Sequence, residues 1–165
     1  MAALALQDLS PAFDMVDHCI LLRHLCVSYG IREAALSWIS LYVTDRQQCI
    51  WHAVTQSTHV FIKFGVPQGS ILGLLLFVLY TADLVPLIAE HRLHSHLYAD
   101  DTQVYSWCQP TDVSLLQDNM SRCFNDKWRW MCSNRLQLNA LMTEFIWCTP
   151  ACRRHHVPDL DVQVG

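Results

Sequence analysis

Residues 93–107 read LHSHLYADDTQVYSW. Two strand-like apolar runs, 93–98 and 102–107, are joined here through the tripeptide Ala-Asp-Asp. A short connection of this kind between two such runs is typical of a β-hairpin. Two adjacent carboxylates at a tight hairpin repel each other, so we expect water or a cation to screen them.

A third carboxylate ends another apolar run. Residues 1–8 predict a short strand that finishes at Asp8. If this strand lies beside the hairpin, Asp8 can face Asp100 across one metal site. Divalent cations such as Mg²⁺ prefer carboxylate oxygens, and three carboxylates could hold two ions about 3.5–4 Å apart for in-line phosphoryl transfer. The alternative is that Asp100 and Asp101 are ordinary turn residues, and spacing alone favours that alternative.

The rest of the chain predicts a mixture of helices and strands. Asp17 can cap the first helix, Gly30 suits its left-handed end, and Thr111 can cap the last helix. Helices are expected over 17–29, 32–43, 70–84 and 112–132, and further strands over 47–54, 59–64, 136–138 and 143–148, with 55–58 as a turn. The last helix has apolar residues at helical spacing: Val113, Leu116, Met120, Cys123, Phe124 and Met131. This order favours an α+β fold, with helices on one face of a mostly antiparallel sheet.

The composition is that of a globular protein. The chain has 165 residues, of which 52% are hydrophobic and 16% charged, and this length can close one core. The longest apolar run, 71–80, falls short of the roughly 18 residues that span a bilayer, so we expect a buried helix and no membrane partner. The apolar N-terminus is short and has no basic region before it, so we expect an intracellular protein without a signal peptide.

Cysteine usage and net charge restrict the function classes. We expect the eight cysteines to be reduced thiols packed as small hydrophobes. The net charge of −4, with only two lysines, counts against a self-sufficient nucleic-acid binder. A zinc site is a weaker alternative, because the spacing of its four candidate ligands is not that of a standard finger and adjacent histidines converge poorly on one metal. These candidates are Cys148, Cys152, His155 and His156.

Several ordered motifs carry a family resemblance. They include DLSPAFDMVDH at 8–18, GVPQGSILG at 65–73 and LYADDT at 97–102. Shorter matches lie at 29–31, 44–47, 130–131, 134–136, 138–139 and 143–144. In motif order and spacing the chain resembles the reverse transcriptases of non-LTR retrotransposons, of the jockey-like LINE type. Several ordered motifs over most of a chain are far more specific than one short match.

The resemblance implies a polymerase palm over residues 1–149, followed by a polar tail at 150–165. It implies that Asp8, Asp100 and Asp101 are the catalytic, metal-binding carboxylates. The implied cofactor is a pair of Mg²⁺ ions, or Mn²⁺ in their place. The implied partners are an RNA template, a DNA primer and deoxynucleoside triphosphates, and no protein partner is indicated. In the family, the fingers lie upstream of the palm and the thumb downstream of it, and we expect both to be largely absent from this chain.

The resemblance also implies a set of substrate-binding residues. Phe13 would lie beside the sugar of the incoming nucleotide, and Tyr98 beside the primer end. The loop that packs against template and nucleotide would include Gly65, Pro67, Gln68 and Gly69. The plainer alternatives are a core aromatic at Phe13, a hairpin filler at Tyr98 and a strand-to-helix connector for the loop.

The chain departs from the family pattern at three positions. Met142 stands where the family usually carries a lysine that assists proton transfer to pyrophosphate, so we expect slowed catalysis. Gln7 stands where an apolar residue is usual, and Leu74 where proline is common. A catalytically inactive retroelement remnant is therefore the alternative to an active polymerase.

Overall fold

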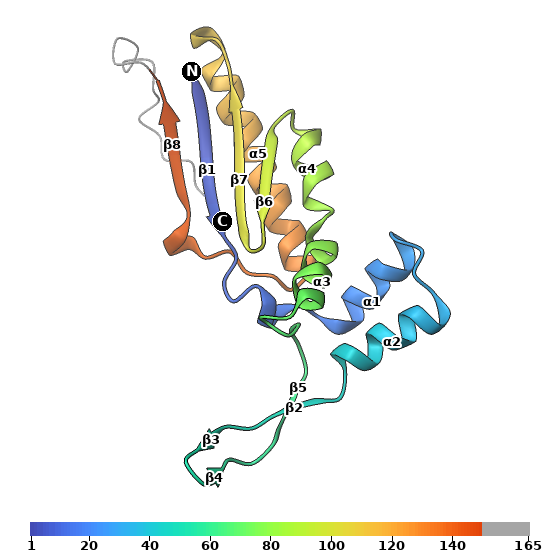
Figure 1. Cartoon of the computed structure of the whole chain (residues 1–165). Helices are drawn as coiled ribbons and strands as arrows, with labels where there is room; N and C mark the ends of the chain where they lie inside the picture. The colour runs from blue at the N-terminus through green and yellow to red at the C-terminus, as the bar shows by residue number, and fades with distance from the viewer. Residues whose placement is uncertain (150–165) are drawn as a thin grey trace. The chain divides into compact units, whose positions relative to one another are not determined.

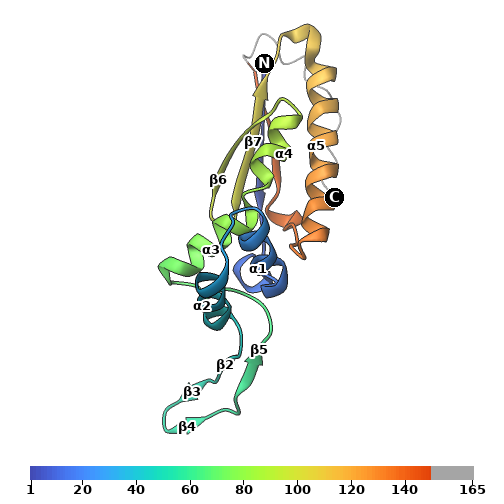
Figure 2. The same cartoon turned by 90° about the vertical axis from the view of Figure 1, so that its right-hand side faces the viewer.

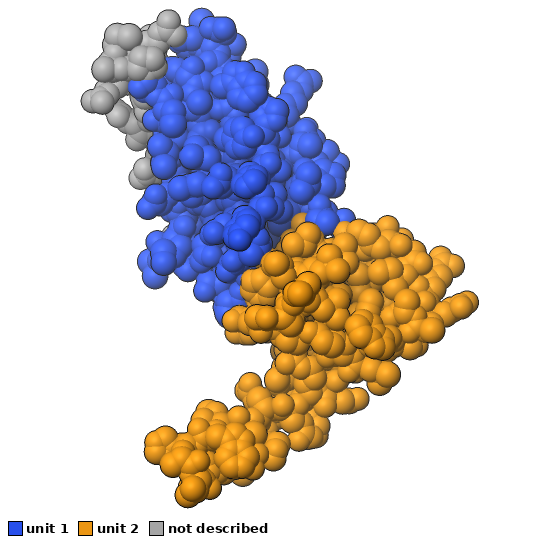
Figure 3. Space-filling model, viewed as in Figure 1, with its two compact units in different colours: residues 1–12, 82–165 blue, residues 13–81 orange. Residues whose placement is uncertain are grey.

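The structure is a computed structural model that describes residues 1–149. The chain forms two compact units, coloured separately in Figure 3. The first contains Met1–Ala12 and the chain from Ala82 onward, and the second is Phe13–Thr81. Each unit is described by itself below.

A four-stranded antiparallel sheet forms the first unit's framework (Figure 1). Its strand order is β6-β7-β1-β8. The strands are β1 (Ala2–Asp8), β6 (His94–Tyr98), β7 (Asp101–Trp107) and β8 (Glu144–Cys148). The predicted strand ending at Asp8 and the predicted hairpin are therefore confirmed.

Two helices cover one face of this sheet. α4 (Leu84–Glu90) and α5 (Val113–Ser133) lie on the same side of it, as Figure 2 shows. All six apolar positions predicted for the inner face of α5 are buried. The core between helices and sheet includes Ala3, Ala5, Ile88, Val104 and Met120. The α+β prediction is confirmed, because the helices cover one face of a wholly antiparallel sheet.

Three helices pack together in the second unit. They are α1 (His18–Val27), α2 (Glu33–Val43) and α3 (Ile71–Thr81), preceded by a 3-10 turn, η1 (Phe13–Met15). Their buried apolar side chains are Leu21, Leu25, Ile39, Val43, Leu76, Phe77 and Tyr80. The predicted cap is confirmed, since the Asp17 carboxylate accepts hydrogen bonds from the backbone N–H groups of Cys19 and Ile20, at 2.9 and 3.0 Å. Gly30 has the expected left-handed conformation, at φ 68°.

The second unit also contains a long β-arm, which lies between α2 and α3 in the chain. Its inner pair is β2 (Arg46–Gln48) with β5 (Val60–Ile62), and its outer pair is β3 (Trp51–His52) with β4 (Thr55–Gln56). The predicted turn over 55–58 is wrong, because Thr55 and Gln56 pair with the preceding strand. The connection between the outer strands contains Ala53 at φ 53°.

Three further expectations need correction. The helix expected over 70–84 ends at Thr81, and α4 follows after a turn. Thr111 does not cap α5; it lies in the 3-10 turn η2 (Pro110–Asp112), and its hydroxyl donates to the Asp112 carboxylate. The strand expected over 136–138 is a single bridge between Leu138 and Leu9. A 3-10 turn, η3 (Ala140–Met142), then leads into β8.

The apolar run at 71–80 is buried on one face only. Leu76, Phe77 and Tyr80 are fully buried, whereas Ile71 is 93% exposed. Taken with α4, the stretch Ile71–Glu90 is long and apolar enough to cross a membrane by length and composition, with a mean hydropathy of 2.3. The core helix of a soluble protein passes the same test, so this finding is weak evidence for a membrane span.

The cysteines differ in part from the expectation. The seven within residues 1–149 are free thiols. Only Cys123 among them is buried, whereas Cys19, Cys132 and Cys148 are exposed, so packing as small hydrophobes is wrong for these three. Of the four zinc-ligand candidates, Cys152, His155 and His156 lie outside the described residues.

Candidate active site

The three predicted catalytic carboxylates come from two neighbouring strands and the turn between β6 and β7. Asp8 ends β1 and is the direct cross-strand partner of Asp101 at the start of β7. Such a pair has its β-carbons about 5 Å apart. Both residues belong to the more open face of the sheet, because β1 and β7 alternate with buried positions on the helix side.

Asp100 lies in the turn next to this pair. Tyr98 pairs with Asp101, which leaves Ala99 and Asp100 as a two-residue connection. Ala99 adopts a left-handed conformation at φ 52°, which an L-residue adopts at a cost. The carbonyl of Asp100 accepts a hydrogen bond from the Leu9 N–H at 3.2 Å, so the turn is held to the chain immediately after Asp8.

Asn139 contacts Asp8 from the segment before β8. Its side-chain Nδ2 donates to Oδ2 of Asp8 at 3.1 Å, and its backbone N–H donates to the Asp8 carbonyl at 3.0 Å. η3 follows Asn139 directly and packs near β1. Met142, the side chain in place of the family's lysine, is 64% exposed at the end of this turn.

The opposite face of β1 carries a buried polar pair. Gln7 is 3% exposed and Lys127 is 1% exposed. The Lys127 ammonium donates to Oε1 of Gln7 at 2.6 Å. Burial lowers the pKa of Lys127 to about 8 and raises the pKa of the neighbouring Cys123 thiol to about 11. The polar residue at position 7 therefore has a specific partner on α5.

The donor set fits a hard divalent cation. Like charges directly opposite each other on a sheet are destabilising, so Asp8 and Asp101 would both gain from a shared positive charge. Carboxylate oxygens are the ligands that Mg²⁺ and Mn²⁺ prefer. As the side chains stand, no three ligand-type residues within 1–149 are close enough to hold an ion. The backbone register places Asp8 opposite Asp101, but the three carboxylates do not converge on one point in this structure.

Tyr98 is placed where it can meet a ligand. It is 75% exposed on the hairpin, so it does not fill the turn. Phe13 behaves differently, because its ring stacks on the buried Phe77 with centroids 4.5 Å apart. The core-aromatic alternative at Phe13 thus has direct structural support within the second unit.

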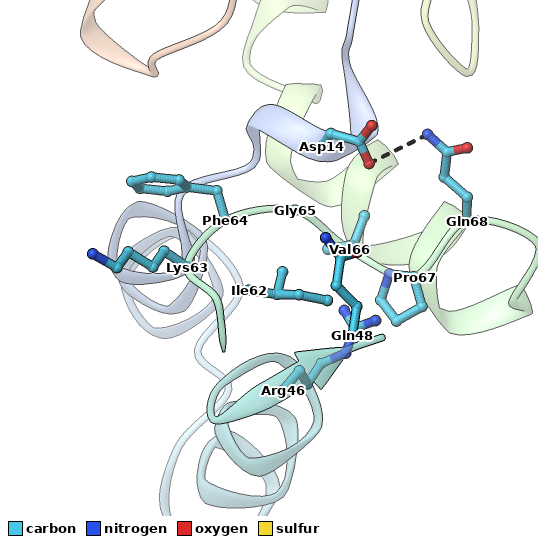
Figure 4. Close-up of a pocket in the computed structure, with 10 residues that line it drawn as sticks. All are labelled: Asp14, Arg46, Gln48, Ile62, Lys63, Phe64, Gly65, Val66, Pro67 and Gln68. Atoms are coloured by element: carbon cyan, nitrogen blue, oxygen red, sulfur yellow. Dashed lines mark hydrogen bonds between the residues drawn. The ribbon is translucent and has the colours of Figure 1, made fainter. Parts of the chain in front are cut away.

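The glycine-rich loop lines a pocket of about 460 Å³ in the second unit (Figure 4). Gly65, Pro67 and Gln68 contribute to its wall, and Gly69 does not. Figure 4 shows Asp14 and Arg46 on opposite sides of this pocket. Gln68 reaches Asp14 only through a long contact of 3.5 Å, so its amide remains available to a ligand.

Gly65 is required by its surroundings. It has φ 90°, and a β-carbon there would lie 3.0 Å from the Asp14 backbone. His18 also holds the backbone at Gly65, since its Nε2 is 2.8 Å from the Gly65 carbonyl oxygen in a buried contact. No sequence pattern indicated this contact between the first helix and the loop.

A comparison with models of protein families matches residues 2–149 to "Reverse transcriptase (RNA-dependent DNA polymerase)". The chain belongs to the reverse transcriptase family. Reverse transcriptases generally use divalent metal ions and act on an RNA template, a DNA primer and deoxynucleoside triphosphates. A comparison with curated proteins found no match.

Membership in the reverse transcriptase family confirms the predicted palm-like fold class and the enzyme class of RNA-directed DNA polymerases. Sequence reasoning missed two contacts of the site, those made by His18 and Asn139. Asn139 lay within a matched motif, but it is 131 positions from Asp8, and no local pattern links the two residues.

Proposed function

We propose that this chain is the palm portion of a non-LTR retrotransposon reverse transcriptase of the jockey-like LINE type. Its reaction is RNA-templated addition of deoxynucleotides to a primer 3′-hydroxyl. The observation that carries the proposal is the pairing of Asp8 with Asp101, with Asp100 in the adjoining turn, inside a chain matched over 2–149.

Asp8, Asp100 and Asp101 are the proposed holders of two Mg²⁺ ions, for which Mn²⁺ can substitute. Bound there, the ions would lower the pKa of the primer hydroxyl and stabilise the leaving pyrophosphate. The chain's own contribution is positional. The register pairs Asp8 with Asp101, and the hydrogen bond from the Leu9 N–H to the Asp100 carbonyl ties the Asp100 backbone to the chain just after Asp8.

Substrate contacts are proposed for the residues that the motifs single out. Tyr98 is exposed on the hairpin, and Gly65, Pro67 and Gln68 line the pocket of the second unit. Arg46 and Lys63 add two positive charges to that pocket, which suits the phosphates of a template or nucleotide. Gly69 and Phe13 belong to the same proposed set, with Phe13 acting through its ring beside the sugar.

Primer extension tests this proposal. The purified 165-residue chain is incubated with a DNA primer annealed to an RNA template, deoxynucleoside triphosphates, and Mg²⁺ or Mn²⁺. We expect extension that Asp100→Asn reduces to background, because that variant removes a metal-binding charge. Asp118→Asn on the exposed face of α5 is the matched control and should extend like the unchanged chain.

Two results would contradict the proposal. Absence of extension with either metal would favour the inactive remnant. Extension that survives Asp100→Asn would show that the activity does not depend on the proposed carboxylates.

A further inference from the structure

Asn139, in the segment that precedes β8, takes part in five hydrogen bonds. Two of them reach Asp8, one from the backbone N–H and one from the side-chain amide. The other three stay local. Its Oδ1 accepts from the Leu141 N–H at 3.2 Å, and its carbonyl accepts from the Met142 N–H at 3.1 Å and the Thr143 hydroxyl at 2.9 Å.

This set of partners fixes which way the amide points. The Leu141 N–H is a donor, so the group facing it must be the oxygen of the Asn139 side chain. The NH₂ group is thereby directed to the Asp8 carboxylate, which can only accept when ionised. The amide orientation thus follows from the hydrogen-bond chemistry of both partners.

Because of the contact with Asn139, the two carboxylate oxygens of Asp8 are in different situations. Oδ2 is held by Asn139, whereas Oδ1 accepts no hydrogen bond within the described residues 1–149. A carboxylate held at one oxygen loses rotational freedom and keeps the other oxygen available to a cation. Hydrogen-bond partners of metal-ligating carboxylates orient them in this way.

We propose that Asn139 is a positioning residue, which orients the Asp8 carboxylate for a divalent cation. The inference rests on the proposed function, since it assumes that Asp8 is a metal ligand. It adds a residue that neither the motif comparison nor the cross-strand register assigns to the site.

The competing explanation is that Asn139 only caps η3. Two substitutions separate these roles. Asn139→Ser keeps an N-cap oxygen for the Leu141 N–H but is too short to reach Asp8, whereas Asn139→Leu removes both contacts. A capping role predicts that only the leucine variant is affected, and a positioning role predicts that both are.

The measurement is Mn²⁺ binding to the full chain, followed by the electron paramagnetic resonance signal of the free ion. We expect Asn139→Ser and Asn139→Leu each to raise the Mn²⁺ dissociation constant about 10-fold. Asn125→Ser, the same change at an exposed position on α5, is the matched control and should bind like the unchanged chain. Asp8→Asn is measured beside them to show that the binding depends on Asp8.

The outcomes distinguish this inference from the proposed function. If Asp8→Asn leaves Mn²⁺ binding unchanged, the proposed metal site fails and the inference fails with it. If Asp8→Asn weakens binding but Asn139→Ser does not, the inference alone is overturned. Tighter binding by Asn139→Ser would also overturn it, because Asn139 would then hold Asp8 away from the metal.

A second measurement uses the unchanged chain, so it does not require an Asn139 variant to fold. The side-chain amide resonance of Asn139 should shift on addition of Mg²⁺ to the unchanged chain, since its acceptor oxygen belongs to a metal ligand. The same titration of Asp8→Asn should leave that resonance in place. An Asn139 amide that does not respond to Mg²⁺ in an otherwise Mg²⁺-binding chain would contradict the positioning role.

Discussion

Burial of the Lys127 ammonium costs free energy of folding, and its hydrogen bond to Gln7 reduces that cost. Its ammonium is almost completely removed from water and has the Gln7 side chain as its hydrogen-bond partner. A neutral amide compensates a buried charge less well than a carboxylate, and burial is accordingly the main cause of the lowered pKa. An apolar pair of similar volume would avoid this cost altogether.

This pair predicts a specific dependence of stability on pH. The folded pKa of Lys127 is about 8, below its ordinary value of 10.5, so the unfolded chain binds more protons between these values. Lys127 should therefore make the free energy of unfolding rise with pH, with a contribution of about 1 kcal/mol between pH 8 and 9. Urea unfolding at both pH values measures this change. The raised pKa of Cys123 opposes this rise from about pH 8 upward, because the unfolded thiol, with a pKa of 9.0, loses its proton there while the folded state retains it, so the net rise is smaller than the Lys127 contribution.

The double variant Gln7→Leu/Lys127→Met is the control. It should lose the rise between pH 8 and 9 and gain roughly 1–4 kcal/mol of stability at pH 7. Lys127→Met alone should gain less, because it leaves the buried amide of Gln7 without its partner. An unchanged rise in the double variant would show that another group causes it.

For single residues, the sequence showed one member of a long-range contact but not its partner. The polar residue at position 7 was visible as a departure from the family pattern, but its partner is 120 positions away on another element. Asp17 as an N-cap was predictable, because capping depends only on the following three residues. Long-range contacts such as those of Lys127 and Asn139 depend on the packing of whole elements, which one sequence does not specify.

At the scale of elements, α1 positions the glycine-rich loop. Asp17 caps its first turn and its backbone forms an isolated antiparallel β-bridge with Phe64. His18 contacts the Gly65 carbonyl. The start of one helix therefore fixes the beginning of the proposed substrate loop. A change that frays this turn should loosen the loop as well.

Asp17→Ala should lower the free energy of unfolding by about 1 kcal/mol, because two backbone N–H groups lose their side-chain acceptor. Asp17→Asn retains an acceptor oxygen and should keep most of the stability. Chemical denaturation of both variants measures the difference. Equal losses in the two variants would mean that the carboxylate charge, and not the cap, provides the stabilisation.

The accuracy of the predicted elements followed the strength of their local patterns. The hairpin and α5 were predicted well, because alternation and helical spacing persist over many residues there. The outer turn of the β-arm was misplaced, since Ala53 adopts a left-handed conformation that no glycine or asparagine signals. The bridge at Leu138 is too short to be distinguished from a strand by composition.

For the molecule as a whole, acidic charge is concentrated in the unit that carries the catalytic candidates. The described part of the first unit has nine acidic and five basic residues, whereas 13–81 has four of each. The overall charge of −4 thus comes from the carboxylate-bearing unit. This distribution suits a site that binds cations, and it leaves phosphate contacts to be sought elsewhere, including Arg46 and Lys63 in the pocket.

Thermal unfolding with and without Mg²⁺ tests most directly whether Asp8, Asp100 and Asp101 form a cation site. Binding to the folded state alone should raise the melting temperature, with about 2.7 kcal/mol of stabilisation at 100 times the dissociation constant. Asp8→Asn and Asp101→Asn should melt no lower than the unchanged chain without metal, because each relieves a like-charge pair, and both should lose the Mg²⁺-dependent increase. Asp118→Asn should retain the increase. Two results would contradict a cation site at these carboxylates. One is a melting temperature that does not change with Mg²⁺, and the other is a Mg²⁺-dependent increase that persists in both Asp8→Asn and Asp101→Asn.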